Sequence, residues 1–232
     1  MNLCYKVLGV RVCVHLRMVT METMGSAFVK RTCPLLLFTA MVWGQQYKAD
    51  KAGPPPPGVA SGIAQSLEKM GFQISNNGAA YCELWFRSSL PSVTATQEQN
   101  VTLRNVAEGT LLGVIRYDGH GSDRRGQAIQ PGVYTLRYGT MPMNGSHQGA
   151  APQRDFLLLT PAAEDRDLNA VSNFDALVAM SRKASGTPHP AVLSLWKADA
   201  DSPGFSQQGD TDWVLQATVG DTPIAVIVAG TN

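Results

Sequence analysis

The sequence predicts a mostly β protein: an antiparallel β-sandwich or jelly roll that also carries one or two short helices. Two observations lead to this expectation. Apolar and polar residues alternate along several short segments, as they do on strands with one buried face. Turn residues, above all Gly, Pro, Asn and Asp, separate these segments at short intervals. Of the 232 residues 44% are hydrophobic and 16% charged, which excludes a disordered or fibrous chain.

The first 44 residues have the pattern of a secretory signal. Lys30 and Arg31 precede a short apolar run at 33–44, in which Val42 and Gly44 suit the −3 and −1 positions of a cleavage site. The run is shorter than the roughly 20 apolar residues that span a bilayer. We therefore expect a secreted or periplasmic protein that meets the membrane only transiently, through its signal; an uncleaved anchor is the alternative.

The part before this signal is unusually long for a leader. Residues 1–23 add a segment that a secretory signal does not need, and three methionines, Met18, Met21 and Met24, offer later starts. Beginning at Met24 gives a compact basic region before the apolar run. We expect translation to start at Met21 or Met24.

The remainder of the chain is mildly acidic. The first 44 residues hold five of the 19 basic residues and one of the 18 acidic residues, which leaves the rest with a net charge of −3. Such a domain has no general attraction for nucleic acid, so no nucleic-acid partner is expected. Cys82 is the only cysteine after the leader, no Cys/His spacing suits zinc, and no metal or other cofactor is expected.

A linker and then a single domain follow the leader. Residues 45–58 are polar and end in four prolines and a glycine, which predicts a stiff extended linker before one β-rich domain at 59–232. Residues 61–70 have the apolar spacing of a short amphipathic helix. A second helix is expected at 173–185, with Ser172 as its cap and Gly186 at its end.

Eight segments of the domain predict strands. The first two flank Asn76, Asn77 and Gly78, a sequence typical of a tight β-hairpin turn. The predicted strands are 72–75, 79–87, 111–117, 133–138, 156–159, 191–196, 213–218 and 224–228.

Strand 79–87 shows the clearest alternation. Cys82, Leu84 and Phe86 fall on one face, which predicts a core face. The other face carries Trp85 beside charged residues, and an exposed aromatic side chain of this kind can bind a sugar or a peptide. The alternative is a cross-strand charge ladder that the helix at 173–185 covers.

Polar residues concentrate in the loop at 118–131. Asp118, His120 and Asp123 are potential metal ligands, and Arg124 and Arg125 are potential binding residues for an anion or a carboxylate. Their spacing matches no established metal loop, so the alternative is a solvated glycine-rich loop with a local Asp–Arg pair.

A second long loop, 139–153, contains His147 and two methionines. Long loops in compact domains are often functional, although this one can also be a surface excursion packed by its methionines. The two loops leave opposite ends of the strand at 133–138, roughly 20 Å apart. We therefore expect that His120 and His147 share no metal.

Two segments carry a resemblance to known proteins. Residues 131–136 have the pattern P-G-x-Y-x-L, which resembles a strand of bacterial Ig-like and transthyretin-like domains. The stretches 123–138 and 154–159 together are similar to a family of uncharacterised exported bacterial proteins. The resemblance implies a β fold and export, and it brings no known chemistry.

Two functions remain open at this stage. The chain has no nucleophile elbow, H-E-x-x-H or P-loop motif, which favours an exported, non-catalytic module with a binding or structural role. The alternative is a hydrolase or metal-dependent enzyme with its site on the loops 118–131 and 139–153, using His120 or His147 with a carboxylate. Convergence of His, Asp and Arg in one pocket would favour the enzyme.

Overall fold

The computed structural model describes residues 2–7, 10–15, 46–143, 153–169, 173–199 and 204–230, and the chain divides into two units, Met1–Trp43 and Gly44–Asn232. In the first unit β1 (Asn2–Val7) and β2 (Val10–His15) pair as an antiparallel hairpin. The basic residues and apolar run of the predicted secretory signal, at 30–44, and the alternative starts Met18, Met21 and Met24 lie outside the described residues. No helix within the described ranges is long and apolar enough to cross a membrane.

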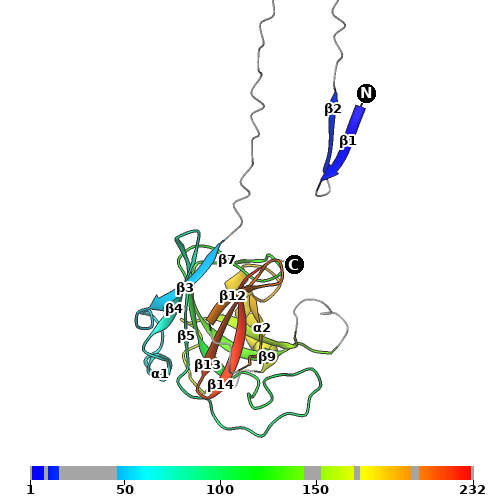
Figure 1. The fold of residues 1–232 in the computed structure, drawn as a ribbon. Coiled ribbons are helices and arrows are strands. Elements are labelled where there is room, and N and C mark those ends of the chain that lie inside the picture. The colour runs from blue at the N-terminus through cyan, green and yellow to red at the C-terminus, as the bar shows by residue number, and fades with distance from the viewer. Residues whose placement is uncertain are drawn as a thin grey trace, which may run out of the picture. The chain divides into compact units, whose positions relative to one another are not determined.

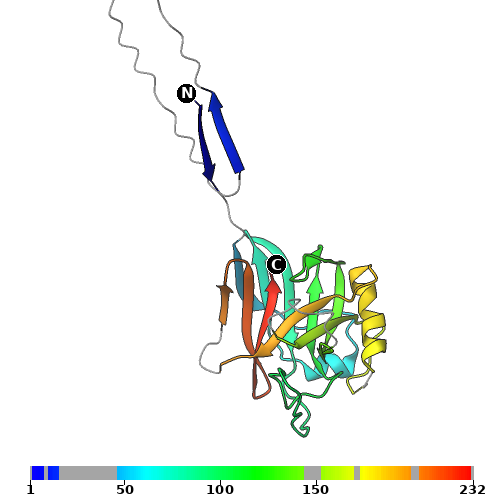
Figure 2. The same cartoon turned by 90° about the vertical axis from the view of Figure 1, so that its right-hand side faces the viewer.

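The second unit is built on one antiparallel sheet of ten strands that curls until it is nearly closed into a barrel (Figures 1 and 2). The prediction of a mostly β, antiparallel fold with one or two short helices is confirmed. The strands follow one another across the sheet in the order β12 (Gly204–Gln208), β13 (Asp212–Val219), β14 (Thr222–Ala229), β11 (Val192–Lys197), β10 (Asp155–Pro161), β9 (Gly132–Thr140), β6 (Leu111–Tyr117), β5 (Ala79–Phe86), β4 (Gly71–Asn76) and β3 (Tyr47–Ala52).

The predicted hairpins form where the turn residues allow them. Asn77 and Gly78 join β4 to β5 with φ angles of 49° and 85°. Two successive positive φ angles are typical of the tight turn whose twist matches the strands, and Asn and Gly adopt them at low cost. Gly220, with a φ of 59°, plays the same part between β13 and β14. All eight predicted strands are present, with ends shifted by a few residues.

The prediction of a linker at 45–58 is wrong in part. Residues 47–52 form the edge strand β3, which pairs with β4 from Tyr47 opposite Asn76 to Ala52 opposite Gly71. Only Tyr47 and Ala52 of this strand are buried, so its sequence lacks the alternating apolar residues by which strands are recognised. The proline segment after it also packs on the domain, since Pro56 is buried.

Three other strands escaped prediction because they are short or exposed. β7 (Gly121–Ser122) and β8 (Ala128–Ile129) form a two-residue ribbon inside the loop 118–131. The opposite edge strand, β12, is exposed along most of its length.

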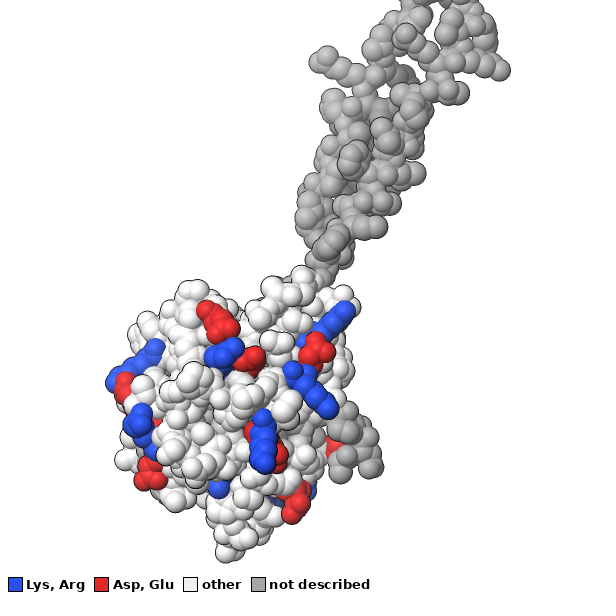
Figure 3. All heavy atoms as spheres, turned by 90° about the vertical axis from the view of Figure 1, so that its left-hand side faces the viewer, with Lys and Arg blue, Asp and Glu red and all other residues white. Residues whose placement is uncertain are grey.

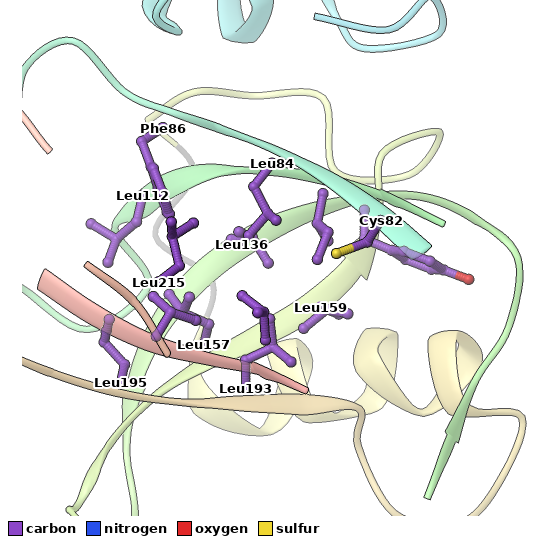
Figure 4. Packing of buried hydrophobic residues seen from close by; sticks show 14 of the residues in the cluster. Cys82, Leu84, Phe86, Leu112, Leu136, Leu157, Leu159, Leu193, Leu195 and Leu215 are labelled. Atoms are coloured by element: carbon purple, nitrogen blue, oxygen red, sulfur yellow. The ribbon is translucent and has the colours of Figure 1, made fainter. Parts of the chain in front are cut away.

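The main core fills the inside of the curled sheet (Figure 4). Cys82, Leu84 and Phe86 of β5 point into it, as the alternation predicted, and meet leucines from the opposite wall such as Leu193 and Leu215. The two walls thus interdigitate as the two sheets of a sandwich do.

The two edges of the sheet, β3 and β12, are not paired with each other. Aromatic side chains join them instead. The rings of Tyr47 on β3 and Trp213 on β13 lie 5.5 Å apart, and Phe205 on β12 stacks on Trp213 at 5.6 Å. Ring contacts, and not backbone hydrogen bonds, therefore connect the two edges at this seam of the nearly closed sheet.

Two helices cover parts of the outer face of the sheet: α1 (Ser61–Ser66) and α2 (Phe174–Ser185), the latter on the flank seen in Figure 2. α2 matches the predicted helix. Its cap is Asn173, whose Oδ1 accepts a hydrogen bond from the Ala176 amide at 2.9 Å, while the expected cap Ser172 lies outside the described residues. Gly186 ends it in the left-handed conformation, as expected.

The prediction that Trp85 lies on an exposed outer face is wrong. Its side chain is 1% exposed and packs with Ile63 of α1 and Leu111 and Val114 of β6. The indole Nε1 donates a hydrogen bond of 2.8 Å to the carbonyl of Gly53. The alternative of a covered face was nearer, although α1 and not α2 provides the cover.

Candidate functional site

A pocket of about 220 Å³ lies beside α2, and both long loops contribute to it. Arg125 comes from the loop 118–131, and Met141 and Pro142 come from the start of the loop 139–153. The remaining described lining comes from α2, β10, β11 and the connection between α2 and β11. The loops that the sequence marked therefore do reach a common place.

The wall of this pocket is apolar. Phe156 of β10 and Phe174 of α2 meet edge to face, with ring centroids 6.2 Å apart. Val178 and Val192 continue the wall, and Met141 packs beside them. Phe174, Val178 and Met141 are only partly buried, so their apolar surface is accessible from the pocket.

Basic residues form the other end of the pocket. Arg125 is held in place, because its Nη2 donates to the carbonyl of Pro190 at 3.0 Å and its guanidinium also binds the carboxylate of Asp123. Arg182 and His189 line the same pocket and are exposed. No carboxylate belongs to the part of the lining that the structure describes.

The last turn of α2 is fixed to the start of β11, and this sets the position of the basic end. The hydroxyl of Ser181 donates to the carbonyl of Ala191 at 2.7 Å, and the Ser185 hydroxyl donates to the carbonyl of His189 at 2.6 Å. Both serines are buried. Arg182 therefore projects from a part of the helix that the fold holds rigidly.

Asp123 and Arg124 have structural roles instead of the predicted ligand-binding ones. Asp123 is 1% exposed, and its Oδ1 accepts hydrogen bonds from the amides of Arg125 and Gln127. The Arg124 Nε lies 3.0 Å from both carboxylate oxygens of Asp212 and ties the loop to β13. Both side chains are thus occupied by the protein itself.

The other predicted ligands do not converge. Asp118 and His120 are exposed, and Asp118 pairs with Arg116 at 3.2 Å. No group of three or more His, Cys, Asp or Glu residues that suits a metal occurs in the described part of the chain. His147 lies outside the described residues, so the statement that it shares no metal with His120 stays a prediction.

Of the basic residues of the pocket, Arg125 was predicted, together with Arg124, as a potential anion-binding residue, whereas Arg182 was not among the predicted site residues. The sequence does not reveal that Arg124 is bound by Asp212 while Arg125 reaches the pocket. A signal for Arg182 exists, because Phe174, Val178 and Arg182 recur every fourth residue and so share one stripe of the helix. An apolar stripe that ends in an arginine is a pattern worth searching for on exposed helices.

A buried charge pair lies on the outer face of the sheet and is not part of the pocket. Arg137 of β9 binds both carboxylate oxygens of Asp165, at 2.8 and 2.7 Å, and the hydroxyls of Thr135 and Thr160 donate to the same carboxylate. Burial alone raises the pKa of this carboxyl, but the hydrogen bonds and charge of Arg137 outweigh burial and lower it. The group is therefore ionised and structural.

Two wider hollows lie near Gly220, at the β13–β14 turn. One, of about 440 Å³, lies between Phe72 and Phe86 on one side and Gln216 to Thr218 on the other. The second, of about 410 Å³, is lined mainly by polar loop residues. Both are more open than the pocket beside α2, and neither combines an apolar wall with a group of like charges.

On the face shown in Figure 3 basic and acidic side chains alternate, and no region of one sign stands out. That the protein binds no nucleic acid stays a prediction.

Comparison with known proteins identifies no relative: no family model, no curated protein and no solved structure matches this chain. The fold and the pocket together define the chain as a protein with a nearly closed antiparallel sheet and a small apolar pocket on its outer flank.

Proposed function

We propose that this protein is an exported, non-catalytic module that binds a small molecule in the pocket beside α2. The export component rests on the leader, with its basic residues, short apolar run and small residues before Gln45. Cleavage after Gly44 leaves the whole curled sheet intact, because its first strand in chain order begins at Tyr47.

The observation that carries the binding proposal is the pocket itself. Ligand sites are concave, mostly apolar and equipped with a few placed polar groups. The pocket beside α2 has an aromatic and aliphatic wall with arginines at one end, although its 220 Å³ is below the usual range of about 300–1,000 Å³. A small ligand therefore fits better than a large one.

The described residues favour binding over catalysis. A general acid–base or metal-dependent mechanism needs a carboxylate or a second histidine within reach of His189. The described lining contains neither. The predicted enzyme alternative, on His120 with a carboxylate, gains no support either, because His120 and Asp118 are exposed to solvent outside the pocket.

The binding proposal is tested with 1-octanol, a neutral apolar probe, by calorimetric titration and by NMR of the protein's methyl groups. We expect saturable binding, with shifts at Val178 and Met141. Val178→Trp fills the pocket and should abolish binding. Ala179→Trp is the matched control, since Ala179 is the exposed neighbour on the same helix and does not line the pocket.

Two results contradict the binding proposal. The first is that octanol does not bind the native protein. The second is that octanol still binds the Val178→Trp variant, while both variants keep the melting temperature of the native protein.

Export is tested separately by expressing the full chain in a bacterium with a periplasm. We expect the protein in the periplasm or medium, with Gln45 as its first residue in peptide mapping. A cytoplasmic product that keeps residues 25–44 would refute the secretory signal.

A further inference from the structure

We infer that the ligand of the pocket beside α2 is an amphiphilic anion, a medium-chain or aromatic carboxylate, whose apolar part contacts the phenylalanines and whose acid group binds Arg182 and Arg125. This inference rests on the proposed binding function and goes beyond it by naming the ligand class. Its basis is the separation of apolar and basic groups along the pocket.

The pocket has two chemically different ends. Phe174 and Arg182 lie eight residues apart on one stripe of α2, which places their Cα atoms about 12 Å apart along the helix axis. Phe174 meets Phe156 at the apolar end. Arg182 follows Ser181, which is bonded to Ala191, and so lies near Pro190 and Arg125. A ligand that satisfies both ends is elongated, apolar for most of its length and polar at one tip.

The charge of the basic end is not cancelled. Asp123 takes up much of the charge of Arg125, with which it is paired. Arg182 makes no ion pair in the described part of the chain, whereas its neighbour Lys183 is paired with Glu164 at 2.7 Å. Since no Asp or Glu belongs to the described lining, Arg182 leaves an excess of positive charge there. A cationic ligand is disfavoured and an anionic one is attracted.

The geometry of the arginines suits a carboxylate. A guanidinium presents its N–H groups as a planar fork that matches two carboxylate oxygens. Arg125 is already oriented by Asp123 and by the carbonyl of Pro190, and these bonds use its Nε and Nη2, so that among the described residues Nη1 keeps its hydrogen-bonding capacity. Pre-orientation lowers the entropy cost of binding. Arg125 thus offers one fixed donor group, and Arg182 offers a complete fork.

The experiment compares three probes of nearly equal size: octanoate, 1-octanol and octylammonium. Their affinities for the native protein are measured by calorimetry at low ionic strength, below the concentrations at which the probes aggregate. We expect octanoate to bind at least about tenfold more tightly than octanol, a difference of about 1.4 kcal/mol. Octylammonium should bind more weakly than octanol.

The variants assign this preference to a residue. Arg182→Gln should reduce the affinity for octanoate about tenfold and leave that for octanol unchanged, and Arg182→Glu should make octylammonium the preferred probe. Lys183→Gln is the control, because Lys183 is the adjacent cation, is paired with Glu164 and lies outside the lining. We expect no change in the affinities of the Lys183→Gln variant for the probes.

The outcomes separate this inference from the proposed function. Equal affinity of the native protein for all three probes overturns the anion inference and leaves the binding module standing. A preference for octanoate that Arg182→Gln retains, or that Lys183→Gln loses to the same extent, overturns the assignment to the basic end. If none of the probes binds, both proposals fall together.

Discussion

The two helices cover the outer face of the same sheet and do so with opposite results. The α1 flank, formed by α1, Trp85 and their neighbours, is sealed: Ile63 is fully buried and Trp85 is 1% exposed. The α2 flank, formed by α2, Phe156 and Leu158, buries Leu177 but leaves Phe174 and Val178 partly exposed around a pocket. The shorter helix covers its flank completely, and the longer one does not.

The difference lies in what each flank places between helix and sheet. Trp85 fills the space under α1 and satisfies its indole N–H on the Gly53 carbonyl. Under α2 the largest side chains, Phe156 and Phe174, meet edge to face at one end, and arginines take the place of apolar residues at the other. A helix that approaches a sheet over one large side chain supports stability, whereas a helix that ends in basic residues can accept a ligand.

The largest effect is expected from Trp85→Ala, which should destabilise the protein by about 3–5 kcal/mol because it leaves a cavity under α1. Phe174→Ala on the α2 flank should cost about 1–2 kcal/mol, since its ring is already partly exposed. Urea unfolding of the two variants measures both values. A loss for Trp85→Ala smaller than that for Phe174→Ala would reverse the comparison of the flanks.

Breaking the buried pair beside the α1 flank should have a similar but slightly smaller effect. Leu168 packs on that flank, and Arg137 holds the segment that carries it through Asp165 and the Asp167 and Leu168 carbonyls. Asp165→Asn removes the carboxylate charge that the buried Arg137 binds, and a loss of about 3 kcal/mol is typical when one partner of a buried ion pair is removed. The variant's free energy of unfolding at neutral pH measures this.

Acid should weaken the same pair in the native protein. The pKa of the Asp165 carboxyl is lower in the folded protein than in the unfolded chain, so its contribution is fully present above the unfolded value of about 4 and is lost as the pH falls through the folded value. Thermal unfolding between about pH 6 and 2 should show a loss of melting temperature in the native protein that is smaller in Asp165→Asn. Identical pH profiles would exclude this role.

Substitution and labelling of Cys82 test the core that lies beneath both flanks. Cys82→Ser should cost about 1–3 kcal/mol, because the hydroxyl is left without a partner. Burial also raises the pKa of the Cys82 thiol well above its usual value, so labelling of the native protein by a thiol reagent at pH 8 should be slow. Rapid labelling without unfolding would show that the inside of the sheet opens readily.

The smallest effect is expected at the caps. Asn173→Ala removes the hydrogen bond that begins α2 and should cost about 1 kcal/mol. α1 has no side-chain cap at Ala60, so Ala60→Ser offers a matched test of whether a cap improves the sealed flank. A fall in octanoate affinity in Asn173→Ala, at temperatures where the protein stays folded, would show that the start of α2 also shapes the pocket.

The strands that surround the main core were predictable because each has a turn signal and an alternating or continuous apolar sequence. Cys82, Leu84 and Phe86 face the core as their spacing indicated. Trp85 was misplaced for a physical reason: alternation tells which residues share a face, but not whether a later or earlier segment covers that face. The cover came from residues 53–67, part of which was read as a linker.

The site was predictable only as far as its loops. The sequence marked 118–131 and 139–153 as functional candidates, and both contribute to the pocket. It did not indicate that Asp123 and Arg124 would be used up by bonds to the protein's own amides and to Asp212, since those partners come together only in the folded sheet. Arg182, the proposed partner of the ligand's acid group, lies on a helix and not in a loop.

The contacts across the seam between β3 and β12 determine when the folding of the sheet can be completed. Tyr47 stands at the beginning of the first strand of the sheet, and its partner Trp213 lies on β13, the last strand but one of the sheet in chain order. Because a domain generally folds as a unit, the ring contacts across the seam form only once β13 has been synthesised. A chain that is truncated before β13 therefore keeps the residues of the β3–β4 hairpin but lacks the partner that Tyr47 meets across the seam.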